Sequence, residues 1–490
     1  MSRADLIGPQ ISSSLSLRAE GLSVVEGSRI YYTQIMRYKL LFFLIIILAI
    51  FLRFYRLPEM APFDFDQEYA ANFAYSVLKT FPVQLIGQGL SVEGLFMGPF
   101  YFYLLVPFFA LSNLHPLGGA VASSIFGIVI VFAYFWAGKQ IFGTKAGLIA
   151  AFIRAILFNE LLHDWSAAPA YSSELLVLTV WYIFYKYWQG ETKLSPLLGL
   201  IFGLFTSIHP ILFPLYIIFL ILLLIKRKLP GFKITVLSFF AFLLPQIPLL
   251  IFESLRNFYE VKILLAFGGS GRGLQYPSLY FKFNMAEIQR ILNLQIIPPE
   301  TFTVVFLGIL VVLAFKKVAF FRNNFHASML ILTYFVFIIY YALFPKKVPE
   351  YYFLTLTTLA ILYTGALLNL LAKKKIFIAL LAVLLANIFW GNFQAIMGRW
   401  ENGSLMNLSH KDAIVKEILK NQPKNEEFFV SYIKYYGWNS GFDYLFKLYG
   451  QVPQTREAKP PVYSIVIPRF LVSEADMDFT SGNIGLILPK

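Results

Sequence analysis

The chain has 490 residues, of which 58% are hydrophobic and only 14% charged, whereas soluble globular domains contain about 25% charged residues, so an ordinary water-soluble protein is excluded. The absence of cysteine excludes disulfides, thiol catalysis and Cys-based metal centres, and the five histidines form no metal-binding motif. The formal charge of +14 resides mostly in short turns between apolar segments, which is typical of membrane proteins and excludes a basic nucleic-acid-binding domain.

The N-terminal residues 1–35 are polar and rich in serine, and the first apolar segment covers residues 39–56. A cleaved signal peptide would end at small residues, but the basic Arg53 and Arg56 close this segment instead. We therefore expect an uncleaved first span. Residues 1–35 are expected to be either a disordered cytoplasmic tail or a gene-call extension upstream of a native start at Met36.

Apolar segments that could cross a membrane recur throughout residues 36–394, which predicts an all-α polytopic membrane domain. We predict about eleven spans, at residues 39–56, 118–138, 146–159, 172–188, 195–208, 210–225, 232–252, 302–316, 325–344, 352–371 and 376–394. The basic turns between them all face the cytoplasm only if residues 98–113 do not cross completely. We therefore expect a re-entrant or interfacial helix at 98–113, with the N-terminus inside and the C-terminus outside.

The C-terminal residues 395–490 differ in composition from the rest of the chain. An amphipathic segment with a capping-box pattern begins at Ser409. Residues 428–433 and 462–467 are predicted to form strands, with a helix near 441–449 between them. We interpret this part as a small α/β domain on the extracytoplasmic side of the membrane.

Three carboxylates, those of Asp64, Asp66 and Glu68, occur within five residues of the loop that follows the first span. Carboxylates at a membrane surface can act as a general base, bind a divalent metal or accept hydrogen bonds from sugar hydroxyls. They can equally serve the helix predicted to follow, where Asp64 or Asp66 would cap the N-terminus and Glu68 would complement the dipole. The residues alone leave both interpretations open.

An ordered set of motifs in residues 36–394 resembles the GT-C glycosyltransferases, in particular the protein O-mannosyltransferase and aminoarabinose-transferase-like group of glycosyltransferase family 39. The motifs are Asp66-Gln67 after the first span, the run from Gly94 to Leu105, the turn from Ile141 to Leu148, the segment from Pro248 to Phe258, and Tyr351-Tyr352. The usual Asp-Glu pair of the family is Asp66-Gln67 here, so it is open whether Glu68 replaces the missing acid.

The resemblance implies transfer of a single sugar from a polyprenyl-phosphate donor in the membrane to an acceptor hydroxyl, on the extracytoplasmic face and with inversion. It implies Asp66 as the general base, while the acceptor could be a protein, a glycolipid or a glycan. Cations and hydrogen-bond donors are needed where charge grows on the departing phosphate. The candidates for substrate binding are Asp64, Glu68, Asp164, His209, Arg256, Arg272, Lys346, Lys347, Tyr351 and Tyr352. No cofactor is required by this chemistry, although a divalent metal is possible.

Two candidates have plain structural alternatives: His209 could only close the turn at Pro210, and Asp164 could only cap the helix that begins near Ala170. Two other functions remain as alternatives to the enzyme. A transporter or flippase for lipid-linked sugars would place ionisable groups at mid-membrane and show repeated halves, neither of which we see in the sequence. A non-catalytic relative of the family is the third interpretation, favoured by Gln67.

Overall fold

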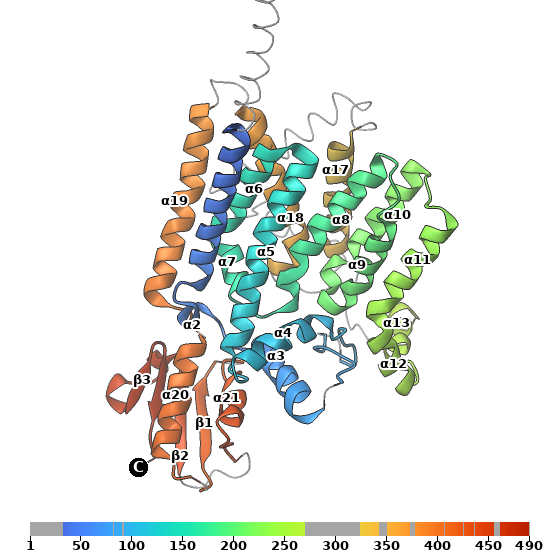
Figure 1. Cartoon of the computed structure of the whole chain (residues 1–490). Coiled ribbons are helices and arrows are strands. Elements are labelled where there is room, and N and C mark those ends of the chain that lie inside the picture. The colour runs from blue at the N-terminus through green and yellow to red at the C-terminus, as the bar shows by residue number, and fades with distance from the viewer. Residues whose placement is uncertain are drawn as a thin grey trace, which may run out of the picture.

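The computed structural model describes residues 33–489 apart from 82, 91–92, 270–323, 343–349, 373–377, 406, 425, 436 and 455–460. The described chain forms a bundle of roughly parallel helices with a small α/β domain at one end (Figure 1). We call the end that carries this domain the domain end. The predicted fold class, a polytopic helical membrane domain with a small C-terminal α/β domain, is confirmed.

The bundle consists of apolar helices that correspond to the predicted spans. They are the first helix (Thr33–Phe54), α5 (Leu117–Phe142), α6 (Thr144–Ile156), α8 (Ser173–Trp188), α9 (Ser195–Ile208), α10 (Pro214–Lys226), α11 (Phe232–Leu243) with α12 (Ile247–Leu255), α17 (Phe325–Ala342), α18 (Leu354–Leu371) and α19 (Ile378–Asn402). Within the described residues, four helices are long and apolar enough to cross a membrane. A fifth is obtained if α6 and α7 (Phe158–Asp164), which meet at an angle of 70°, form one broken span. The predicted span at 302–316 lies outside the described residues.

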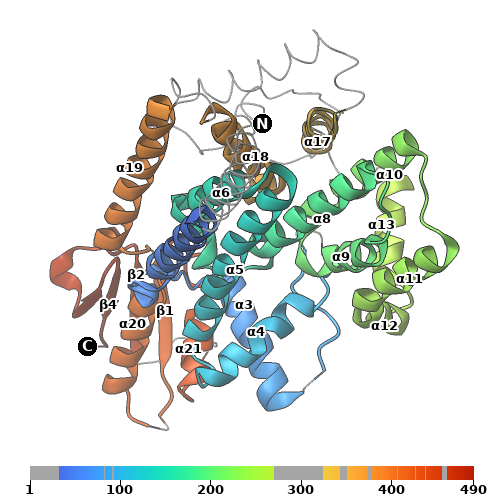
Figure 2. The same cartoon turned by 45° about the horizontal axis from the view of Figure 1, so that its top comes forward.

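Small residues allow the central helices to approach closely. A Cβ atom added to Gly138 on α5 would lie 2.6 Å from the Cα atom of Gly147 on α6. Such small-residue contacts are the usual way in which helices associate in lipid, where burial of apolar surface gives little driving force. Helices α11, α12 and α13 (Tyr259–Gly269) lie at the edge of the bundle farthest from the small domain (Figure 2).

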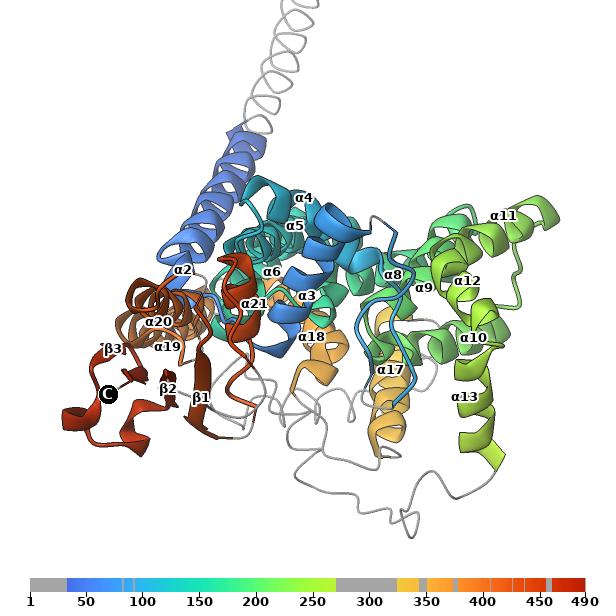
Figure 3. The ribbon, with the colours of Figure 1, turned by 90° about the horizontal axis from the view of Figure 1, so that it is seen from below.

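Short elements cover the domain end of the bundle. Helices α2 (Leu57–Met60) and α3 (Phe65–Tyr75) follow the first helix, and α4 (Phe100–Leu111) lies beside α3 instead of running along the bundle (Figure 3). This placement agrees with the interfacial helix predicted at 98–113. Between α3 and α4, the antiparallel bridge Gly89–Phe96 closes a hairpin-like loop.

The small domain contains α20 (Leu408–Asn421), α21 (Phe442–Leu448) and a four-stranded sheet in the order β1-β2-β4-β3. Strands β1 (Phe429–Lys434) and β2 (Val462–Ile467) are parallel and match the two predicted strands, whereas the antiparallel hairpin of β3 (Phe479–Ser481) and β4 (Ile484–Ile487) was not predicted. Helix α19 continues through position 395 to Asn402, so a continuous helix crosses the boundary that we predicted between the membrane domain and the small domain.

Candidate active site

A cavity of about 540 Å³ opens at the domain end, between α3, the loop before α4 and several turns of the bundle. The turns belong to η2 (Pro169–Ser172), His209–Ile211 and η5 (Glu350–Phe353), and α17 contributes Tyr340. Segments that are far apart in the sequence therefore converge on one space. Its volume suits a small-molecule site, which typically occupies about 300–1,000 Å³.

Four predicted site residues line this cavity together: Asp66, His209, Tyr351 and Tyr352. Asp66 is the second residue of α3, whose N-terminus is closed by a capping box between Asp64 and Gln67. The capping interpretation of Asp64 is thus confirmed, and it fixes the direction in which the next turn presents its side chains. As a result, Asp66 points its carboxylate into the cavity from the first turn of α3, whose N-terminus is capped.

The carboxylate of Asp66 has one side-chain partner among the described residues, the amide of Gln88. Gln88 Nε2 donates to Asp66 Oδ1 at 2.6 Å, and Gln88 is 8% exposed and lines the same cavity. The sequence did not single out Gln88, because a neutral amide in an irregular loop matches no motif. Its only signal is the flanking pair Gly87 and Gly89, which lets the backbone approach other segments closely.

His209 lies in the turn between α9 and the next helical segment and has two roles. Its Nδ1 accepts a hydrogen bond from the Ile211 backbone N–H at 3.3 Å, so the turn-closing interpretation is confirmed. Burial lowers the pKa of His209 to about 4, so the ring is neutral near pH 7 and its proton resides on Nε2. His209 therefore offers this cavity a neutral imidazole and not a cation.

Aromatic rings form one wall of the cavity. The His209 ring packs edge-on against Tyr351 and Tyr352, with centroids 5.7 and 5.2 Å apart. Tyr351 meets Tyr171, whose ring in turn stacks on His163 at 4.2 Å. Such rings suit the apolar faces of a sugar. Tyr171 and Tyr340 join the two predicted tyrosines in the lining, and sequence reasoning missed both.

The other members of the acidic loop turn away from the cavity. Gln67 is buried and donates to Ser166 Oγ at 2.6 Å, while Glu68 accepts the Tyr444 backbone N–H of α21 at 3.1 Å. Glu68 therefore faces the small domain and does not stand beside Asp66 as a second acid. The fully buried Lys411 of α20 donates to the carbonyls of Phe63 and Ser440 at 2.6 and 2.5 Å, next to these acids.

Lys411 and the nearby acids Asp64 and Glu68 carry opposite charges in an interface that is largely shielded from water. Burial lowers the pKa of Lys411 to about 8. Burial also raises the pKa of Asp64, with the nearby Asp66 as the next cause, and raises that of Glu68. For all three groups the loss of hydration outweighs the attraction between opposite charges, so the hydrogen bonds that they make must offset this cost. This contact fixes the outer face of α3.

Asp164 belongs to a buried charge cluster behind the cavity. Arg53 Nη2 lies 2.7 Å from Asp164 Oδ2, and Arg154 binds both carboxylate oxygens of Asp164 at 2.8 and 2.9 Å. Arg154 also pairs with Glu174 at 2.7 Å, and all these side chains are nearly or fully buried. Sequence reasoning missed both arginines, although a lone Arg154 within an apolar segment was a usable signal.

The remaining predicted residues lie elsewhere. Arg256, at the end of α12, stacks its guanidinium on Phe96, Phe252 and Tyr259 at 4.9–5.5 Å and does not line the cavity. Arg272, Lys346 and Lys347 lie outside the described residues. Among the described lining residues there is neither lysine nor arginine.

The acids of the loop do not converge as metal ligands would. In the part of the chain that the structure describes, no three His, Asp or Glu side chains come together in a way that could hold a metal ion. Asp66 faces the cavity while Glu68 faces α21, so the loop does not supply the several convergent oxygens that a divalent cation needs. We derive no step through a metal.

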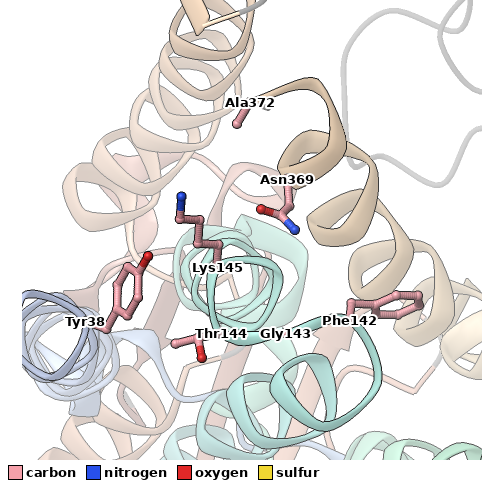
Figure 4. A pocket seen from close by; sticks show the side chains of 7 residues that line it. All are labelled: Tyr38, Phe142, Gly143, Thr144, Lys145, Asn369 and Ala372. Atoms are coloured by element: carbon pink, nitrogen blue, oxygen red, sulfur yellow. The ribbon is translucent and has the colours of Figure 1, made fainter. Parts of the chain in front are cut away.

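A second cavity, of about 380 Å³, shown close up in Figure 4, lies at the turn between α5 and α6, at the end of the bundle opposite the small domain (Figure 1). It is lined by Tyr38, Phe142, Gly143, Thr144, Lys145, Asn369 and Ala372. Lys145 belongs to one of the predicted basic turns, and no carboxylate lines this space. The acidic cavity and this basic turn therefore occupy opposite ends of the molecule.

No protein-family model matches the sequence, and no curated protein sequence matches it. Solved structures do match. ArnT from Cupriavidus metallidurans bound to undecaprenyl phosphate superimposes with a TM-score of 0.57 at 11% identity, over 91% of this chain and 97% of that one. The same protein in the apo state superimposes with a TM-score of 0.59 at 11% identity, over 93% of this chain and 98% of that one. The archaeal oligosaccharyltransferase AglB from Archaeoglobus fulgidus, in complex with an inhibitory peptide and a dolichol-phosphate, gives 0.55 at 11% identity, over 86% and 64%.

The likeness extends over nearly the whole of this chain. At such low identity it establishes the architecture and not the activity. The chain is a multi-pass membrane protein with the GT-C fold of ArnT and AglB.

Proposed function

We propose that this chain is a membrane glycosyltransferase that moves a single sugar from a polyprenyl-phosphate donor to an acceptor hydroxyl, with inversion and at the extracytoplasmic face. The observation that carries the proposal is Asp66, which lines a cavity of about 540 Å³ at one end of an apolar bundle. The structures with this fold that contain undecaprenyl phosphate or dolichol-phosphate support the donor class.

The acceptor side of the reaction needs a base. Asp66 takes the proton from the acceptor hydroxyl while that oxygen forms a bond to the anomeric carbon. The bond between this carbon and the phosphate oxygen breaks, and the polyprenyl phosphate leaves with the electron pair. Because a single displacement occurs from the face opposite the leaving group, the anomeric configuration inverts.

The donor side needs a stacking surface and stabilisation of the departing phosphate. Tyr351, Tyr352 and the neutral His209 line the cavity and are suited to bind the sugar and its hydroxyls. The predicted topology puts Arg272, Lys346 and Lys347 in loops on the same side of the membrane, so we assign the departing phosphate to them; they lie outside the described residues. Arg256, Asp64, Glu68 and Asp164 are assigned to support, because each is engaged away from the cavity.

The orientation in the membrane follows from charge. The basic turn between α5 and α6, which contains Lys145, lies at the end of the bundle opposite the Asp66 cavity (Figure 1). Basic turns are retained on the cytoplasmic side, so the Asp66 cavity and the small domain are assigned to the extracytoplasmic side.

The test compares wild-type protein with Asp66→Asn in native membranes supplied with undecaprenyl- and dolichyl-phosphate sugars carrying radiolabelled mannose, glucose or aminoarabinose. We expect wild type to transfer label to membrane or protein acceptors and Asp66→Asn to be slower by about 10²–10⁴-fold. The exposed Asp476→Asn is the matched control. Full transfer by Asp66→Asn would remove Asp66 as the base. Movement of labelled lipid between leaflets without transfer would favour a flippase.

A further inference from the structure

The loop between α3 and α4 presents a polar side chain to the cavity from a firmly held backbone. Gly87 N–H donates to Met97 O at 2.6 Å, and Met97 N–H donates to Gln88 O at 2.9 Å, so the two arms of the loop pair around Gln88. The adjacent Gly98 donates to Thr206 O at the end of α9 at 3.0 Å. A Cβ atom on Gly98 would collide with the Ser207 side chain, so glycine allows this close contact.

A second anchor holds the far arm of the loop. The backbone N–H of Phe96 donates to Glu260 Oε1 on α13 at 3.2 Å, and the Glu260 backbone N–H donates to Glu253 Oε2 on α12 at 2.8 Å. The arm of the loop that pairs with Gln88 is thus tied to α9 through Gly98 and to α13 through Phe96. The Gln88 backbone is in turn bound to this arm through Met97.

We propose that Gln88 is the positioning residue of the base: its amide holds Asp66 Oδ1 and leaves Oδ2 to receive the acceptor proton. This inference rests on the proposed function. A carboxylate accepts and cannot donate, so the 2.6 Å contact requires Nε2 to be the atom that faces Asp66. The amide retains a second N–H and its carbonyl oxygen, which are suited to bind a hydroxyl of the sugar or the acceptor.

The neutrality of this partner matters for the chemistry. A guanidinium or ammonium beside Asp66 would stabilise the carboxylate strongly and reduce its affinity for a proton. A neutral amide orients the carboxylate with a weaker effect on its basicity. Orientation of this kind is worth a large part of catalysis, because a base that is displaced or rotated loses alignment with the attacking oxygen.

The test measures kcat and KM for the labelled donor that wild type uses, in the full-length protein. For Gln88→Leu we expect kcat to fall about 10–100-fold with KM changed less than about threefold. Gln84→Leu is the matched control, since Gln84 belongs to the same loop and does not line the cavity. Thermal unfolding of each variant, expected within about 1 °C of wild type, excludes misfolding as the cause.

Gln88→Glu gives a readout that a purely structural role would not produce. At acidic pH the protonated carboxyl group introduced at position 88 donates to Asp66 as the amide does, whereas at higher pH two carboxylates repel each other. The rate of Gln88→Glu relative to wild type should therefore fall by about fivefold or more as pH rises from about 5.5 to about 8.5. The other titratable groups that face Asp66 or hold its loop are Asp64, His209, the cavity tyrosines, Lys411 beside Asp64, and Glu260, which binds Phe96. The pKa values of Glu260 and Lys411, about 7 and about 8, fall within the tested range, but both groups are also present in wild type, so the rate relative to wild type reports on position 88. His209 stays neutral and phenols stay protonated over this range.

The outcomes separate this inference from the proposed function. If wild type transfers sugar and Asp66→Asn does not, the function stands and the Gln88 variants decide the inference. A Gln88→Leu variant with wild-type kcat, or a Gln88→Glu variant with a pH profile parallel to wild type, would overturn it. A wild type that transfers none of the donors above Asp66→Asn would overturn the function itself.

Discussion

Two aspartates of this protein, Asp66 and Asp164, occupy contrasting environments. Asp66 lines the cavity, and among the described residues its only side-chain partner is a neutral amide. Asp164 is 3% exposed, and two buried arginines bind both of its oxygens. Within the described part of the chain, the carboxylate of Asp66 therefore keeps an oxygen without a side-chain partner, whereas that of Asp164 does not. Position at the cavity together with the number and charge of its partners therefore distinguishes Asp66, the proposed base, from Asp164, which pairs with buried arginines.

The two regions are nevertheless connected. Gln67, next to Asp66, binds Ser166, which lies two residues after Asp164. The charge cluster therefore fixes the segment that leads to Tyr171 and thereby one wall of the cavity. A substitution in the charge cluster should therefore lower the stability of the fold and with it the order of the cavity wall. A substitution of Asp66 should lower the transfer rate and leave the stability nearly unchanged.

The largest effect on stability is expected for Asp164→Asn. The substitution keeps the shape of the side chain and leaves Arg53 and Arg154 short of a counter-charge in a buried site, at a cost of about 3–5 kcal/mol. We expect a marked loss of folded protein in detergent, measured by thermal unfolding and size-exclusion yield. Asp66→Asn should change stability by less than about 1 kcal/mol. Equal stability of the two variants would contradict the contrast between these aspartates.

A second contrast lies between the two faces of α3: Asp66 faces the cavity, whereas Glu68 faces the small domain. Lys411→Met tests the role of the face toward the small domain. Removal of the ammonium leaves the carbonyls of Phe63 and Ser440 unpaired beside the two acids, at a cost of about 2–3 kcal/mol. We expect faster proteolysis between α19 and α20 and a roughly tenfold lower transfer rate through a loosened α3. Lys420→Met, on an exposed position of the same helix, is the control. Proteolysis at the wild-type rate would contradict the predicted role of Lys411.

The fold was largely predictable from the sequence, because apolar periodicity and basic turns report directly on membrane helices. Residues 428–433 and 462–467 were also recognisable as strands, since both are apolar and β-branched or aromatic. The hairpin of β3 and β4 was missed because its strands are only three and four residues long. Short antiparallel pairs depend on tertiary contacts more than on local preference.

The site was only partly predictable. Asp66, His209, Tyr351 and Tyr352 stand beside the ends of predicted spans, so topology alone brings them to one end. Gln88 could not be found in this way, because its role depends on an irregular loop. Lys411 was detectable in principle: it lies on the same helical face as Leu408 and Val415, where a charge must be paired.

The smallest effect concerns the anchor of the Gln88 loop and depends on pH. Burial, with Glu253 as the second cause, raises the pKa of Glu260 from 4.5 to about 7. Between these values the folded protein holds a proton that the unfolded chain has lost, so the free energy of unfolding decreases as pH rises through this range. Glu260→Gln removes the contribution of this proton to the free energy of unfolding. Between pH 4.5 and 7, the melting temperature of the variant should therefore fall by about 1–2 °C less than that of wild type. The exposed Glu426→Gln should keep the wild-type slope. Parallel slopes for wild type and Glu260→Gln would show that this carboxyl group titrates normally and that the loop is held by other contacts.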